Sequence, residues 1–172
     1  MRDCFIYVGR IDELKGIKIL FEAWKQMGAS APQLIVCGTG PLEDWCNNFL
    51  KDNPDLNIEL KGFVPNNEAK KLIANSKALI LPTQWYEGFP MTILEAYSVG
   101  TPVIGSDIGN DGDLIEDGIT GYKFKSDSAS LLVEVIQERD FNICDNVKKV
   151  YMERYTSKEN IRLLEAIYEN VK

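Results

Sequence analysis

Two basic and two acidic side chains in this sequence are spaced so that they could hold a charged ligand. Arg10 and Lys15 lie in GRIDELKG, directly after an apolar run, and the stretch EGFPMTILE begins with Glu87 and ends with Glu95. Guanidinium and ammonium groups bind phosphate oxygens, whereas carboxylates accept hydrogen bonds from hydroxyl groups. Together these residue types suit a ligand that carries both phosphate and hydroxyl groups.

Each pair also has a purely structural explanation. Arg10 and Lys15 could be solvated charges on a surface loop, which is the usual situation of such side chains. If Thr92 is the N-cap of a helix, Glu95 stands three positions later and the two residues form a capping box. The capping box does not explain Glu87. In addition, the first amides of that helix would point at a bound anion.

Composition excludes several classes of function. The chain has no histidine, so it cannot by itself supply a Ser-His-Asp triad, a Cys-His pair or an imidazole-ligated metal site. Its net charge of −7 disfavours a nucleic acid or an anionic membrane as partner. The four cysteines lack the CxxC spacing of a zinc or redox site, which favours free thiols in a reducing, cytoplasmic compartment.

Apolar runs of strand length alternate with segments of helical period, in a chain whose 172 residues suit a single domain. Strands are predicted at 4–9, 33–38, 57–63, 78–83, 102–106 and 121–124. Helices are predicted near 17–24, 41–51, 67–75, 91–99, 127–139, 142–154 and 157–171. This order predicts an α/β fold, a doubly wound parallel sheet of about six strands with C-terminal helices.

In such folds ligands bind at the carboxyl ends of the strands, so the loops that follow the strands are the expected site. In CGTGPLE, Gly38 and Gly40 would let the backbone approach a ligand, but Glu43 stands where a dinucleotide loop has its third glycine. In GFVPNNE, Asn66 or Asn67 is expected to cap the next helix.

The acidic loop SDIGNDGD requires a separate test for metal binding. Asp111 and Asp113 form a D-x-D pair, but the loop does not match the spacing of calcium ligands. Runs of Asp, Asn and Gly are typical of turns and helix caps. The sequence therefore favours turn chemistry here over a metal site.

Five motifs occur in an order that resembles a known family: GRIDELKG, CGTGPLE, GFVPNNE, EGFPMTILE and GTPVIGSDIGNDGDLIEDGITGYKF. They are similar to those of the retaining glycosyltransferases of family four, the glycosyl transferases of group 1. These are two-domain enzymes of the B-type glycosyltransferase fold. The resemblance covers essentially the whole chain and corresponds to the C-terminal, donor-binding domain. We therefore expect a fragment, or one half of a split enzyme, without its N-terminal acceptor domain.

The resemblance implies a role for each matched position. Arg10 and Lys15 would hold the donor diphosphate and offset the charge that builds on it as the glycosidic bond breaks. Glu87 would bind hydroxyls of the transferred sugar and Glu95 those of the ribose, so that Arg10, Lys15 and Glu87 are the expected catalytic residues. The other donor-binding positions implied are Gly9, Gly38, Gly40, Gly62, Phe63, Val64, Gly88, Phe89, Pro90, Thr92, Ile93 and Leu94.

Within this set, backbone at Gly62, Phe63 and Val64 would contact the base, and the amides of Thr92–Leu94 the phosphate. Gly88, Phe89 and Pro90 would shape the pocket around the sugar. The chain has Asn110 and Asp113 where the family commonly has a glycine and a glutamate.

The implied reaction is transfer of a hexosyl-type sugar from a nucleoside diphosphate sugar to a polysaccharide, glycolipid or similar acceptor. No cofactor and no metal is expected, since Arg, Lys and a helix terminus can stabilise the leaving group. The chain alone is expected to be inactive, and any membrane contact would run through the absent domain. Alternatives are an epimerase or phosphorylase of the same fold, and a non-catalytic module that binds a nucleotide or a protein.

Overall fold

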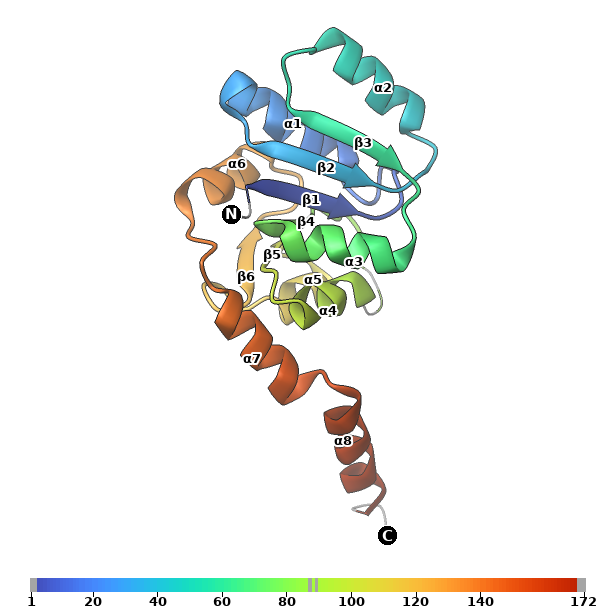
Figure 1. Cartoon of the computed structure of the whole chain (residues 1–172), viewed down its shortest axis with the longest axis vertical. Helices are drawn as coiled ribbons and strands as arrows, with labels where there is room; N and C mark the ends of the chain where they lie inside the picture. The colour runs from blue at the N-terminus through green and yellow to red at the C-terminus, as the bar shows by residue number, and fades with distance from the viewer. Residues whose placement is uncertain (1–2, 87, 89, 170–172) are drawn as a thin grey trace.

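A computed structural model describes residues 3–86, 88 and 90–169, and only the backbone of residue 111. Its centre is one six-stranded sheet with the strand order β3-β2-β1-β4-β5-β6 (Figure 1). Every neighbouring pair is parallel. The strands are β1 (Cys4–Val8), β2 (Gln33–Cys37), β3 (Ile58–Gly62), β4 (Ala78–Leu81), β5 (Val103–Ser106) and β6 (Gly121–Phe124). The predicted strands and the doubly wound parallel fold are confirmed.

The predicted helices are confirmed as well, and one further α-helix is present. The helices are α1 (Ile17–Met27), α2 (Glu43–Asp52), α3 (Asn66–Asn75), α4 (Met91–Ser98), α5 (Gly109–Leu114), α6 (Ala129–Glu138), α7 (Cys144–Arg154) and α8 (Ser157–Glu169), with a 3₁₀ turn η1 (Gly28–Ser30). The sequence did not indicate α5, because Gly109, Asn110 and Gly112 are poor helix formers. Contacts of α5 with β5 override that preference.

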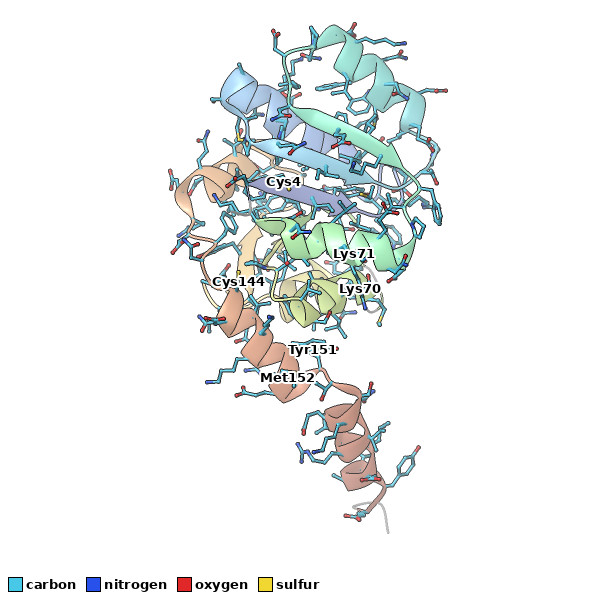
Figure 2. All side chains as sticks on the ribbon, viewed as in Figure 1. Cys4, Lys70, Lys71, Cys144, Tyr151 and Met152 are labelled. Carbon is cyan, nitrogen blue, oxygen red and sulfur yellow. The ribbon has the colours of Figure 1, made fainter. Side chains whose placement is uncertain are left out.

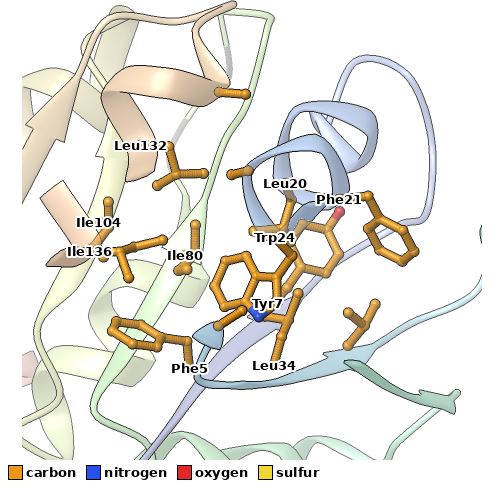
Figure 3. Packing of buried hydrophobic residues seen from close by; sticks show 14 of the residues in the cluster. Phe5, Tyr7, Leu20, Phe21, Trp24, Leu34, Ile80, Ile104, Leu132 and Ile136 are labelled. Carbon is orange, nitrogen blue, oxygen red and sulfur yellow. The ribbon is translucent and has the colours of Figure 1, made fainter. Parts of the chain in front are cut away.

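Both faces of the sheet are buried, because the apolar runs of the central strands alternate between two cores. Phe5 and Tyr7 of β1 point into one core beneath α1 and α6, where Trp24 of α1 also packs (Figure 3). Ile6, between them in sequence, points into the opposite core with residues of α3, α4 and α7. A strand buried on both sides reads as a continuous apolar run, as CFIYV does.

The strand order creates a crevice between β1 and β4. The chain leaves β1 for α1, on one face of the sheet, and leaves β4 for α4, on the other face (Figure 1). Loops that depart in opposite directions from neighbouring parallel strands leave an opening at the strands' carboxyl ends, where ligands bind in open α/β sheets. The loop at 9–16 and the described residues of the loop at 82–90 border this opening.

A close backbone contact joins these two loops. Gly16, at the N-cap of α1, has φ +72°, and a Cβ atom built on it would lie 1.7 Å from the carbonyl oxygen of Pro82. Next to this contact the Gln84 amide donates to the Leu14 carbonyl over 2.7 Å. Only glycine combines the left-handed backbone with so short an approach. The loop after β1 is therefore held against the segment after β4.

The last helix lies apart from the two cores. Helix α8 follows α7 and extends away from the body of the molecule, and its side chains stand clear of the sheet in Figure 2. None of its described residues is buried, and its apolar side chains are exposed: Ile161, Leu163, Leu164, Ile167 and Tyr168. Exposed apolar side chains along one helix are typical of a surface that contacts another protein element.

The contact at Gly16 yields a stability prediction with an internal control. We expect Gly16→Ala to lower the free energy of unfolding by about 3 kcal/mol or more, at the upper end of the effects of single substitutions. Gly118→Ala has a similar positive φ of +73°, but an added Cβ meets no described atom within 4 Å. Its cost should be only the left-handed backbone penalty of about 1–2 kcal/mol. Urea unfolding measures both, and equal losses would contradict the proposed role of the Pro82 contact.

Candidate functional site

A small pocket opens at the carboxyl ends of β1 and β4, with a volume of about 60 Å³. Four predicted donor-binding or catalytic residues line it, and they come from positions far apart in the sequence. The lining residues are Tyr7, Val8, Gly9, Lys15, Leu81, Thr83, Pro90 and Thr92. The structure therefore brings Gly9 and Lys15 of the first motif next to Pro90 and Thr92 of the fourth.

Arg10 and Lys15 belong to one tightly bonded loop. The Tyr7 hydroxyl donates to the Arg10 carbonyl over 2.7 Å, which fixes the start of the loop. The Lys15 amide donates to Asp12 Oδ1 over 2.8 Å, and Arg10 Nε forms an ion pair with Asp12 Oδ2. The Arg10 side chain is 65% exposed, as expected for a solvated charge on a surface loop, but Asp12 connects it to the backbone at Lys15. The sequence analysis missed Asp12, although a carboxylate between two cations at this spacing was a usable signal.

The second loop packs against the first through its glycines. Cβ atoms added to Gly38 and Gly40 would lie 1.8 Å from the Gly9 carbonyl oxygen and 2.3 Å from that of Ile11. The Ile11 amide donates to the Thr39 carbonyl over 2.9 Å. The glycines thus serve an approach between two protein loops, while their approach to a ligand stays a prediction.

Glu43 has a structural task in this loop. Its carboxylate accepts a hydrogen bond from the Gly40 amide over 2.6 Å, at the start of α2. A residue at the beginning of a helix that bonds back to a preceding amide closes the turn. This explains why a glutamate stands where a dinucleotide-binding loop would have its third glycine.

Glu95 does not form the capping box that the sequence allowed. Pro90 is the N-cap of α4, so Thr92 is already the second helical residue, and no side chain of the described residues caps the helix. The Glu95 carboxylate instead accepts a hydrogen bond from Asn66 Nδ2 over 2.7 Å. Glu95 is therefore tied to the start of α3, at the same edge of the sheet as the pocket.

The predicted asparagine cap of α3 is also wrong. Helix α3 begins at Asn66 itself, with Pro65 as N-cap and without a side-chain cap hydrogen bond. This places the Asn66 side chain on the helix, where it reaches Glu95. The partnership of Asn66 and Glu95 had no signal in the sequence, since 29 positions separate the two residues.

The remaining predicted residues lie around this edge or outside the described chain. Glu87 and Phe89 lie outside the described residues, so their roles stay predictions. Gly88 is described, and its carbonyl accepts a hydrogen bond from Asn110 Nδ2 at the start of α5. The Gly62 carbonyl accepts a hydrogen bond from the Gly38 amide. The Phe63 side chain is exposed. Val64 and Leu94 pack at the rim of the second core, where Ile93 is buried.

One predicted phosphate donor already has a partner. The Ile93 amide donates to the Pro90 carbonyl over 3.0 Å, which closes the first turn of α4. Thr92 is the residue of this turn that lines the pocket. The acidic loop is largely taken up by α5 rather than by turns, and no group of three or more potential metal-ligating side chains occurs among the described residues.

The comparisons identify the family. Residues 1–139 match the family described as Glycosyl transferases group 1. An uncharacterized glycosyltransferase of Methanocaldococcus jannaschii is 30% identical, over 88% of this chain and 40% of its own. The amylovoran biosynthesis glycosyltransferase AmsK of Erwinia amylovora is also 30% identical, over 75% of this chain and 34% of its own.

A solved structure shares the fold. The Anabaena protein HepE, crystallised in complex with UDP, superposes with a TM-score of 0.81 at 19% identity, over 98% of this chain and 49% of its own. The chain belongs to the glycosyl transferases of group 1, as its motifs predicted. It spans less than half the length of each of these three proteins. Of the described helices, none has the length and apolar character needed to cross a bilayer.

The buried cysteines near the site yield a chemical prediction. Burial raises the pKa of the Cys37 and Cys46 thiols from 9.0 to about 11. A rise of about two units leaves about a hundredfold less thiolate at neutral pH, and the thiolate is the reactive form. We expect iodoacetamide at pH 8 to label Cys4 well before Cys37 and Cys46, as read by peptide mass spectrometry. Equal labelling rates would contradict this assignment.

Proposed function

We propose that this chain is the donor-binding half of a retaining glycosyltransferase that uses a nucleoside diphosphate sugar. The pocket between β1 and β4 would take the diphosphate. The observation that carries the proposal is that Lys15, in the loop before α1, and Thr92, in the first turn of α4, line one pocket, although α1 and α4 cover opposite faces of the sheet. Arg10 lies in the same loop as Lys15, and Glu95 lies at the same edge of the sheet.

The chemistry follows from these residue types. As the bond between the sugar's anomeric carbon and the diphosphate oxygen breaks, its electron pair stays on that oxygen. Lys15 and Arg10 would offset the negative charge that develops there. An acceptor hydroxyl oxygen would bond to the anomeric carbon, and its proton would pass to the departing diphosphate oxygen. Neither a histidine nor a metal is required for this stabilisation, and Glu87 would bind the sugar's hydroxyls.

The size of the pocket limits what this half can bind alone. Ligand sites typically enclose about 300–1,000 Å³, against about 60 Å³ here. Two charge-assisted contacts contribute about 1.5–3 kcal/mol each before ordering costs. A millimolar complex corresponds to about 4.1 kcal/mol. We therefore expect weak donor binding, with much of the donor outside the pocket.

A second domain would complete the cleft. We propose that an N-terminal acceptor domain, of the kind that the longer relatives have room for, packs against the apolar side chains of α8. Those side chains are exposed along the helix. AmsK is named for amylovoran biosynthesis, so we propose a polysaccharide or a glycolipid as acceptor.

Donor binding can be tested by calorimetric titration with UDP, GDP and ADP. We expect at least one of them to bind, and Lys15→Ala to weaken it about tenfold or more, since one charge-assisted contact exceeds the 1.4 kcal/mol of a tenfold change. Glu95→Ala should weaken the binding of nucleoside diphosphates but not that of pyrophosphate, because the expected contact of Glu95 is to the ribose. EDTA should change none of these affinities.

Lys18→Ala is the matched control. Lys18 lies on α1, forms an ion pair with Glu13 and does not line the pocket. Equal losses for Lys15→Ala and Lys18→Ala would indicate a general charge effect. Unchanged binding in both Lys15→Ala and Glu95→Ala would favour a module that binds nucleotides elsewhere.

The role of α8 can be tested with Ile161→Lys combined with Ile167→Lys. Both side chains are exposed, so we expect the free energy of unfolding of this chain to change by less than about 0.5 kcal/mol. The same pair should reduce sugar transfer in the full-length enzyme. Val147→Lys, at a buried position of α7, is the contrasting variant and should unfold the chain. Full transfer activity with both α8 substitutions would contradict the proposed packing.

A further inference from the structure

Asp12 is a buried carboxylate in the loop that carries Arg10 and Lys15. It is only 5% exposed, whereas Arg10 beside it has a side chain that is 65% exposed. A carboxylate is rarely removed from water unless its charge is matched by a partner. The position of Asp12 therefore needs an explanation beyond a surface loop.

The two oxygens of Asp12 have different tasks. Oδ1 accepts a hydrogen bond from the Lys15 amide, an i to i+3 contact of the kind that closes turns. Asparagine or serine would serve that contact equally well. Oδ2 lies against Arg10 Nε in an ion pair, and no hydrogen bond from the described residues reaches it. The negative charge at this position is thus accounted for by Arg10.

The ion pair constrains the guanidinium of Arg10 in a useful way. Contact through Nε leaves the two terminal nitrogens of the guanidinium, which together can bind a phosphate in a bidentate manner. The ion pair keeps Nε beside Asp12 Oδ2 and so limits how far the guanidinium can move. The Tyr7 hydroxyl fixes the other end of the residue through its carbonyl oxygen. The carbonyl oxygen and Nε of Arg10 thus both have partners, while most of its side chain is exposed.

We propose that Asp12 is a positioning residue that orients Arg10 toward the diphosphate of the donor and, through the Lys15 amide, holds both cations in one loop. The inference rests on the proposed function, because it concerns the same pocket. Asp12 does not touch the ligand. It reduces the freedom that Arg10 must lose on binding, which is how preorganisation raises affinity.

A double-mutant cycle measured by UDP titration tests this role. Asp12→Asn keeps an oxygen for the Lys15 amide and removes the charge that holds Arg10. We expect it to weaken UDP binding about five- to tenfold, as expected for loss of preorganisation of one charged contact. In the Arg10→Ala background the same substitution should change the affinity less than about twofold, because neighbours that act together are not additive.

Glu13→Gln is the matched control. Glu13 is the next residue in the chain, and it pairs with Lys18 instead of Arg10. Removing its charge should leave UDP affinity within about twofold of the wild type, or raise it slightly through weaker repulsion. Circular dichroism checks the folding of each variant. If Asp12→Asn does not fold, Asp12→Ser takes its place in the cycle.

The outcomes separate this inference from the proposed function. Affinity of Asp12→Asn equal to or above that of the wild type overturns the positioning role, and so does an equal loss in the Arg10→Ala background. Unfolding of both Asp12 variants also overturns it, because Asp12 would then serve the fold. If Lys15→Ala lowers the affinity for UDP while Asp12→Asn does not, only the positioning role fails. If the wild-type chain binds no nucleoside diphosphate, both fail.

Discussion

The site depends on one backbone contact, the approach of Gly16 to the Pro82 carbonyl. A single added methyl group would lie 1.7 Å from that oxygen. The contact joins the loop after β1 to the segment after β4, across the point where the strand order reverses. Because the two loops then run to opposite faces of the sheet, Lys15 and Thr92 can line one pocket. Without this contact, Lys15 would lie farther from Thr92 at the start of α4.

The basic side chains Arg10 and Lys15 at the site are opposite in sign to the net charge of the whole molecule. The chain carries a net charge of −7, and exposed charges farther away than about 8–10 Å are largely screened at physiological ionic strength. Attraction of a diphosphate must therefore come from the side chains at the pocket. This makes the arrangement of Arg10, Asp12 and Lys15 more important than their number. Asp12 reduces the local net charge, and it does so while holding Arg10 by one edge.

The proposed donor-binding half would need a second domain to complete its cleft. Its pocket is small, and the apolar side chains of α8 are exposed along the helix. The relatives are more than twice as long as the region they share with this chain. A small pocket is consistent with the proposal that a second domain encloses the donor, since exclusion of water strengthens the contacts to a developing charge.

The sequence by itself determined the strands, all but one of the α-helices, the parallel doubly wound sheet and the family. The strands and helices follow from the apolar pattern, because a strand buried on both faces has a continuous apolar run and a helix has apolar residues along one side. The family follows from the order of the motifs. Only the tertiary structure decided that α5 is helical, that Glu95 bonds to Asn66 and that Asp12 holds Arg10. Local patterns report the preferences of neighbouring residues. Contacts between loops depend on which strands lie side by side, and side-chain orientation within a loop depends on what the fold buries.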